Sequence, residues 1–179
     1  MPTIKSRTFY LEMRRPPAYI LEPIKDGIVL RAVNIPVSFY RFLFRAVGER
    51  WLWVLRAIMS DEELKTVIHD PFVEIYVLYV DGSPAGFAEL DRRTPGEIEL
   101  VYFGLLPEYF SKGLGKYFLR WVIYKAWEYL PERLWLHTCE FDHPAALPNY
   151  LKAGFVQSGE EILEHPVELL VKWRRALIK

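Results

Sequence analysis

The sequence lacks the features that would place a protein in a membrane or in an oxidising compartment. Its single cysteine, Cys139, excludes a disulfide within the chain. The first residues, Met1–Lys5, lack the apolar run of a signal peptide, and no stretch approaches the ~18 uninterrupted apolar residues of a membrane helix. We therefore expect a cytoplasmic protein without a membrane partner.

An excess of charge of either sign is also missing. The chain has 23 basic residues (lysine and arginine together) and 23 acidic residues (aspartate and glutamate together). A balanced chain offers no long-range attraction for a nucleic-acid backbone, so we expect no nucleic-acid partner and a local site for any negative ligand. The 179 residues suit one domain that buries about 70% of its unfolded surface, without internal repeats or low-complexity segments.

What is present is an alternation of strand-like and helix-like segments. Helical spacing predicts helices over 37–47 and from Gly113 to Glu128, and the capping box of Ser60 and Glu63 predicts another over 61–69. Strands are predicted at Ile28–Ala32, Val73–Val80, Pro84–Arg92, Glu97–Leu105 and Leu134–Cys139. Asp81-Gly82 and Pro95-Gly96 are hairpin signals, so the middle three strands should be antiparallel. The crossover helix should bring the last strand parallel to the third, and splaying of that pair would leave a cleft.

The ends of the chain are less regular. Thr8–Glu12 and Tyr19–Glu22 are strand-like, and we interpret residues 1–26 as an N-terminal extension that could form an added hairpin. Gly154–Gly159 and Pro166–Trp173 are predicted as strands. The apolar stretch Trp51–Met59 suits either a buried helix or the wall of a cleft, and core is favoured because large aromatic residues mostly bury area.

A glycine-rich turn, Ser111-Lys112-Gly113-Leu114-Gly115-Lys116, joins a strand to a helix. The first turn of a helix leaves backbone N–H groups unpaired, and such a place binds phosphates. A P-loop is excluded by Phe110 and Tyr117, and a dinucleotide fingerprint by Phe118. The plain alternative is that the glycines only ease a tight turn.

Two motifs together resemble those of the GNAT acyl-CoA N-acyltransferases. Residues 110–115 resemble the family's Gln/Arg-x-x-Gly-x-Gly/Ala loop, with Phe110 in place of Gln or Arg. Residues 142–155 resemble its Asn-x-x-Ala-x-x-x-Tyr-x-x-x-Gly-Phe motif, in which Asp142 replaces the Asn, Ala145 or Ala146 matches the Ala, and Tyr150 matches the tyrosine. The likeness covers roughly residues 27–173. It implies an α/β (α+β) fold: a central, mostly antiparallel twisted sheet with a splayed parallel strand pair, flanked by helices, in a GNAT domain over 27–179.

The resemblance also implies a function and a binding site. GNAT enzymes transfer an acetyl or short acyl group from acetyl-CoA to a primary amine by direct attack in a ternary complex. The residues implied in coenzyme A binding are Phe103, Gly104, Leu105, Phe110, Ser111, Lys112, Gly113, Leu114, Gly115, Lys116 and Asp142. Glycine inside a strand usually marks a bulge or a close backbone approach, and in this family a bulge at the equivalent of Gly104 turns main-chain N–H groups toward the acyl carbonyl.

Two residues are candidates for acid–base chemistry. Glu99 matches the family's glutamate base, with Glu97 and Glu89 as further candidates and pairing with a neighbouring arginine as the plain alternative. Tyr150 matches the tyrosine that gives a proton to the departing thiolate, although Pro148 inside its helix leaves the direction of the phenol open. Main-chain N–H groups near Phe103–Leu105 would stabilise the oxyanion.

The segment His137-x-Cys139-x-x-Asp142-His143 contains four residues of types that bind metals. Strand alternation places only His137 and Cys139 on one face, whereas zinc needs three or four converging ligands, so no metal is predicted. No base lies at a sequence spacing that would indicate activation of Cys139 as a nucleophile.

The sequence does not identify the amine that accepts the acyl group. A small amine is expected, with a protein N-terminus or lysine as further options, and the aromatic residues from Tyr40 to Trp53 favour an apolar or aromatic one. Two alternatives stay open: a non-catalytic acyl-CoA sensor, which Phe110 would suit, and an interaction module that docks through Trp51–Met59. A homodimer is compatible with either.

Overall fold

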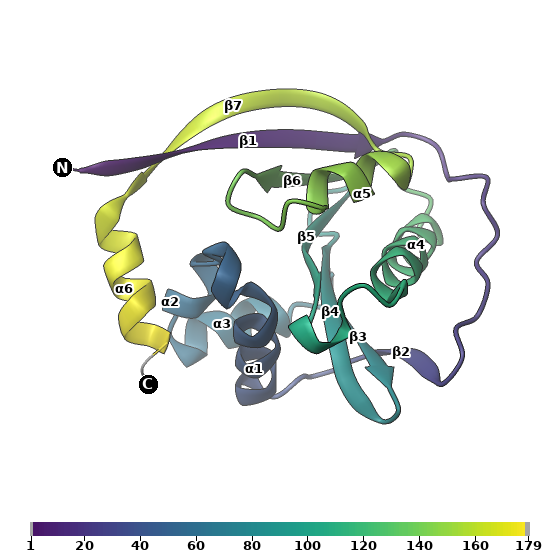
Figure 1. Cartoon of the computed structure of the whole chain (residues 1–179), viewed down its shortest axis with the longest axis horizontal. Helices are drawn as coiled ribbons and strands as arrows, with labels where there is room; N and C mark the ends of the chain where they lie inside the picture. Colours follow the sequence, from purple (N-terminus) through teal and green to yellow (C-terminus); the bar gives the residue numbers. More distant parts are fainter. Residues whose placement is uncertain (1, 178–179) are drawn as a thin grey trace.

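The computed structural model describes residues 2–177, which are organised around a sheet of seven strands (Figure 1). The strands are β1 (Thr3–Met13), β2 (Gly27–Arg31), β3 (Val73–Val80), β4 (Ser83–Asp91), β5 (Glu97–Leu105), β6 (Arg133–Cys139) and β7 (Val156–Pro166). The helices are α1 (Val37–Gly48), α2 (Leu55–Ile58), α3 (Asp61–Ile68), α4 (Leu114–Trp127), α5 (Ala146–Lys152) and α6 (Val167–Leu177), with 3-10 turns at Glu49–Trp51 and Pro107–Tyr109.

The strand order is β2-β3-β4-β5-β6-β1-β7, and every neighbouring pair is antiparallel except β5 and β6. The parallel pairing joins only Glu97–Glu99 to Arg133–Trp135. Beyond those residues the two strands part. The predicted mixed sheet, with its splayed parallel pair and flanking helices, is confirmed.

Local signals in the sequence account for several elements. Asp81 and Gly82 both have positive φ, as a two-residue hairpin turn matching the twist of β3 and β4 requires. Both bonds of the Ser60–Glu63 capping box form at the start of α3, with N···O distances of 2.8 and 3.2 Å. Because α5 begins at Ala146, Pro148 lies in its first turn, where no backbone donor is needed.

Hydrophobic clusters cover both faces of the sheet. One cluster contains Phe118 of α4, and the other contains Leu43 of α1 and Leu64 of α3. Val77 and Leu78 are adjacent on β3 but belong to different clusters, since successive residues of a strand point to opposite faces. The central strands are therefore buried on both sides.

The N-terminal segment differs from the prediction. Residues Tyr19–Glu22 form no strand, so the added hairpin is wrong. Instead β1 lies between β6 and β7, pairs with both, and places Leu11 and Met13 in the core. Its partner strands come from the far end of the chain, where a local reading of the sequence could not find them. The division of the chain at residue 26 stays a prediction.

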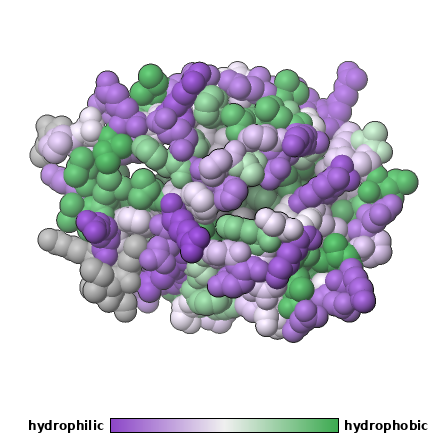
Figure 2. Space-filling model, in the orientation of Figure 1, coloured by the Kyte–Doolittle hydropathy of each residue, from purple (hydrophilic) through white to green (hydrophobic). Residues whose placement is uncertain are grey.

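The C-terminal segment also differs. The strand predicted over Pro166–Trp173 is wrong, because β7 continues to Pro166 and α6 follows it. Val167, Leu170 and Trp173 are half-buried and recur every third residue, a helical period. The helix contacts α2. Hydrophobic residues gather toward the α6 end of the face in Figure 2 and are interspersed with hydrophilic ones elsewhere.

The burial of β1 predicts that the strand contributes to stability. Replacing the fully buried Leu11 by alanine should lower the free energy of unfolding by about 2–5 kcal/mol, because it removes packed methyl groups and leaves a cavity. Ile162→Ala on the neighbouring β7, where the side chain is 66% exposed, should change it by less than about 0.5 kcal/mol. Urea unfolding followed by circular dichroism measures both, and equal losses would show that β1 is not part of the core.

Candidate functional site

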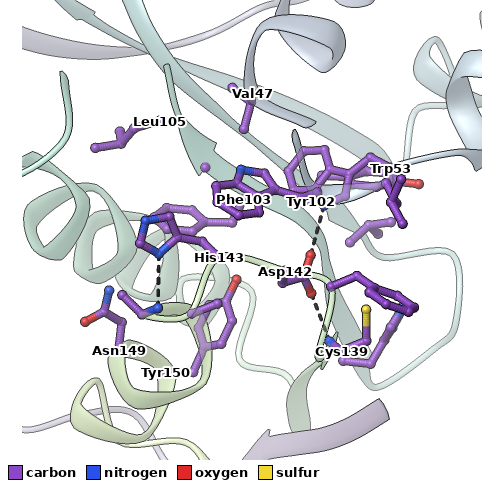
Figure 3. Close-up of a pocket in the computed structure, with 18 of the residues that line it drawn as sticks. Val47, Trp53, Tyr102, Phe103, Leu105, Cys139, Asp142, His143, Asn149 and Tyr150 are labelled. Carbon is purple, nitrogen blue, oxygen red and sulfur yellow. Dashed lines mark hydrogen bonds between the residues drawn. The ribbon is translucent and has the colours of Figure 1, made fainter. Parts of the chain in front are cut away.

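A cavity of about 620 Å³ opens where β5 and β6 part (Figure 3). Its walls come from residues 100–105 of β5, from His137 and Cys139 of β6, from the loop that follows β6 and from α5. The glycine-rich loop borders one end of it, and Ile4 of β1, His165 of β7 and Leu169 and Leu170 of α6 border it elsewhere.

The β5 backbone along the cavity is irregular on one edge and unpaired on the other. Leu100 lies opposite Leu90 and Tyr102 opposite Glu89, so Val101 is an extra residue that forms a β-bulge. On the other edge, β5 pairs with β6 only up to Glu99 within the described residues. Main-chain groups of residues 100–105 therefore border the cavity without a strand partner on that side. The bulge expected at Gly104 lies at Val101 instead.

Gly104 itself shows a close backbone approach, the second of the two features expected at a glycine inside a strand. A Cβ atom placed on Gly104 would lie 2.4 Å from Cγ1 of Val47, so helix α1 packs directly on the strand backbone. Both residues line the cavity, and Val47 is labelled in Figure 3. This contact sets how near α1 comes to the floor of the cavity.

The glycine-rich loop is shaped as a helix N-terminus. Ser111 and Gly113 have φ values of 60° and 76°, in the left-handed region, and α4 begins at Leu114. Within the described residues, no main-chain carbonyl accepts a hydrogen bond from the amides of residues 111–116. Such free amides, at the positive end of the helix dipole, can bind an anion.

Most of the residues predicted to bind a cofactor share this one cavity. It is lined by Phe103, Gly104, Leu105, Phe110, Ser111, Gly113, Gly115, Lys116 and Asp142. Lys112 and Leu114 do not line it: the ammonium of Lys112 lies 5.2 Å from the centre of the Tyr109 ring, and Leu114 packs against the core.

Asp142 connects two walls of the cavity (Figure 3). Its Oδ1 accepts a hydrogen bond from the indole Nε1 of Trp53 at 3.1 Å. Its Oδ2 accepts from the Thr138 hydroxyl at 2.7 Å and from the Cys139 amide at 2.9 Å. The carboxylate thus holds the loop after β6 against the segment before α2.

Tyr150 of α5 lines the cavity with only 9% of its surface exposed. Its ring lies near Phe103 of β5, at 6.4 Å between centroids (Figure 3). Burial, and the nearby charge of Asp142, raise the pKa of the phenol above its ordinary value, so Tyr150 stays protonated. Burial likewise raises the pKa of the Cys139 thiol, which disfavours the nucleophilic thiolate.

The three glutamates predicted as candidate bases differ in their partners and in their access to the cavity. Glu99 does not line the cavity; one of its carboxylate oxygens lies 3.4 Å from Nδ1 of His137, which does. Glu89 is fully buried, receives hydrogen bonds from Tyr40 and from Arg56 at 2.7 Å, and does not reach the cavity. Glu97 pairs with Arg133 on the β6 side.

Other residues line the cavity that the sequence did not predict as site residues. The His143 ring packs edge-on against Trp51 and Phe110, with centroids 5.0 and 5.3 Å apart, and its Nδ1 accepts a hydrogen bond from the Ala145 amide. Trp51–Leu55 lines the cavity, as the cleft-wall alternative for the stretch Trp51–Met59 expected, whereas Trp53, Ala57 and Met59 pack against the core cluster that contains Leu43. His165 lies 2.8 Å from the Ser6 hydroxyl and is the third of the four histidines to line the cavity.

Two negative findings apply to residues 2–177. They contain no group of three or more His, Cys, Asp or Glu side chains that could hold a metal ion. No helix among them has both the length and the apolar character needed to cross a bilayer.

Comparison with known protein families identifies the chain. Residues 38–155 match the model of the acetyltransferase (GNAT) family, which is more than half of the sequence. The chain belongs to the GNAT family. No curated protein matches it in sequence.

Solved GNAT structures share the fold. A GCN5-related N-acetyltransferase from Sphaerobacter thermophilus superposes with a TM-score of 0.68 at 14% identity, over 89% of this chain and 50% of that one. An IAA acetyltransferase from Bacillus cereus gives 0.56 at 22% identity, over 73% and 77% of the two chains. An aminoglycoside acetyltransferase from a soil metagenomic sample gives 0.58 at 14% identity, over 79% and 94%. The chain spans 50–64% of the length of the first four structures it matches.

The contact between Val47 and Gly104 can be tested by a double-mutant cycle. Gly104→Ala should lower the free energy of unfolding by about 1–3 kcal/mol, because the added methyl group overlaps Val47. Val47→Ala vacates that space, so the double variant should be more stable than the sum of the single effects allows. Urea unfolding of the wild type, the two single variants and the double variant measures this. If the two losses of unfolding free energy simply added in the double variant, the close approach would be contradicted.

Proposed function

We propose that this GNAT protein binds acetyl-CoA and transfers its acetyl or short acyl group to a primary amine in a ternary complex. One observation carries the proposal: the free amides of residues 111–116 border the same cavity as the unpaired β5 edge and Tyr150. An anion site, polarised main-chain groups and a buried proton donor are what acyl transfer from a thioester requires.

The residues present fit coenzyme A. The amides after Phe110 suit its pyrophosphate, since neither Gly113 nor Gly115 has a Cβ that would bar close approach, and the Lys116 ammonium adds positive charge. Phe110 offers an aromatic ring where the family has Gln or Arg, so contact there would be apolar. Lys112 points to Tyr109, and we assign it no direct contact.

The chemistry needs a base that takes the proton from the substrate ammonium, hydrogen-bond donors for the carbonyl oxygen, and a proton donor for the departing thiolate. When bound, acetyl-CoA would supply a thioester whose carbonyl carbon bonds to the amine nitrogen as the carbon–sulfur bond breaks and the thiolate takes up a proton. Main-chain N–H groups near Phe103–Leu105 would stabilise negative charge on the carbonyl oxygen. The Tyr150 phenol, held protonated by burial, would supply the proton.

The lining favours an acceptor with an apolar body. Trp51, Leu52, Val54 and Leu55 lie at the cavity, with Leu169 and Leu170 of α6, and few charged groups accompany them. A small aromatic or aliphatic primary amine suits this lining better than a basic protein tail. We propose a cytoplasmic setting.

The second candidate function is a non-catalytic acyl-CoA sensor. It is favoured by Phe110 at a position where the family has a polar residue, and by the absence of Glu99 from the cavity wall. A sensor would bind coenzyme A but release no thiol with any amine. An amine panel with thiol release as the readout decides between the two.

Coenzyme A binding is tested at Gly115. The Cβ of a residue placed there would meet only Leu105, at 3.6 Å, so Gly115→Val leaves the fold intact while filling the space above the loop amides. The dissociation constant for coenzyme A, measured by calorimetry, should rise at least about tenfold. Gly159→Val, an equally open site outside the cavity, should bind like the wild type. No heat with the wild-type chain would refute the proposal.

The role of Tyr150 is tested by its phenylalanine variant. Tyr150→Phe should lower kcat about 10²-fold while coenzyme A affinity stays the same, because only the proton donor is removed. Since burial raises the pKa of the phenol, the wild-type rate should not fall as the pH approaches ~10, the ordinary phenol value. An unchanged kcat in the variant would assign the proton to another donor.

A further inference from the structure

Two ionisable side chains meet at the fork between β5 and β6. Glu99 is the last β5 residue paired with β6, opposite Trp135, and His137 is two residues further along β6. Since alternate residues of a strand share a face, His137 lies on the same face as Trp135, just beyond the point where pairing stops. The carboxylate Oε1 of Glu99 lies 3.4 Å from Nδ1 of His137.

The two residues differ in access to the cavity. The His137 side chain is 46% exposed and lines the cavity, whereas the Glu99 side chain is 22% exposed and does not line it. A substrate amine in the cavity would therefore meet the imidazole, with the carboxylate behind it.

The other groups around His137 do not compete for this role. Tyr10 of β1 is its antiparallel partner, with ring centroids 6.1 Å apart, and the Tyr10 hydroxyl donates to Glu161 of β7. Asp142, in the loop after β6, acts only through its charge and has three hydrogen-bond donors of its own. Cys139 shares the strand face and stays a thiol.

We infer that His137 is the general base that removes a proton from the amine substrate, and that Glu99 is a positioning residue which orients its ring. The inference rests on the proposed acyl-transfer function and names a different base from the glutamate expected by resemblance.

The proton transfer follows from the ring geometry. Nδ1 lies at ion-pair distance from the Glu99 carboxylate, which favours the ring proton on Nδ1 and so leaves the lone pair on Nε2. Nε2 takes a proton from the substrate ammonium, and the neutral amine keeps the electron pair with which it attacks. The resulting imidazolium is stabilised by Glu99, which raises the pKa of His137, and later returns its proton to water.

Other candidates for the base fit less well. Glu89 is fully buried and bonded to Arg56 and Tyr40. His143 uses Nδ1 to accept from the Ala145 amide, and no carboxylate among residues 2–177 forms an ion pair with it. His165 interacts with the Ser6 hydroxyl, which cannot stabilise an imidazolium as a carboxylate does.

The pH dependence of kcat/KM separates the two roles. The test uses 2-phenylethylamine as acceptor and compares the wild type with His137→Gln, Glu99→Gln and His69→Gln. The His137 variant should lose about 10²-fold or more and lack the ascending limb of the wild-type profile. The Glu99 variant should keep a limb, moved about 1 pH unit toward acid, because the imidazolium has lost its carboxylate.

Controls and contrary outcomes are defined by the same profiles. His69 bonds the Ile35 carbonyl outside the cavity, so its variant should follow the wild type. With phenylhydrazine, whose nitrogen is already neutral at about pH 7, the loss in His137→Gln should be much smaller. If Glu99→Gln abolished the limb while His137→Gln kept it, Glu99 would be the base and the inference would be overturned.

A second readout is independent of turnover. Nuclear magnetic resonance titration of the histidine rings, with His137 assigned from its Gln variant, should show the His137 pKa falling by about 1 unit in Glu99→Gln. If the pKa of His137 were the same in Glu99→Gln as in the wild type, the pairing of Glu99 with His137 would be overturned, even if the enzyme were active. If the wild type acylated no amine, the proposed function would fail and the catalytic role with it, whereas the titration would still decide whether Glu99 holds the ring.

Discussion

The short pairing of β5 with β6 is the constraint on which the site depends. Parallel hydrogen bonds join the strands over Glu97–Glu99 only, and after that each strand is held by its other neighbour, β5 by β4 and β6 by β1. Backbone groups along the open edges then have no strand partner, and a cavity bordered by polar main chain results. Buried main-chain groups without partners are costly, so such an opening persists only where solvent or a ligand can satisfy them.

Contacts across the cavity keep its walls in place. Asp142 ties the loop after β6 to Trp53, and Val47 rests on Gly104. Behind the wall, the buried pair of Arg56 and Glu89 anchors the short helix α2 to β4. A four-residue helix has little stability of its own, so its position depends on these tertiary contacts. The shape of the cavity is thus set by interactions among segments distant in sequence.

The sequence could predict those features that depend on residues close to one another along the chain. The Asp81-Gly82 hairpin, the Ser60 cap and the glycine-rich loop each depend on residues within a few positions of one another, and they were found. The place of β1 and the pairing of Glu99 with His137 depend on segments that only the folded sheet brings together. The helix α6 was missed although Val167, Leu170 and Trp173 recur at a helical period within the segment itself. Periodicity within a strand says which face a side chain takes, but not which strand lies beside it.

The position of β1 also has a consequence for how the chain folds. Its partners are β6 and β7, which lie more than 100 residues further along the chain. Contacts of such high sequence separation slow folding, because loop-closure entropy is lost before the contact forms. The half of the sheet that carries His137 and His165 therefore depends on contacts between distant segments, whereas the β3–β4–β5 meander can form from neighbouring residues. Until β6 and β7 pair with it, β1 has unpaired backbone groups on both edges, which favour aggregation.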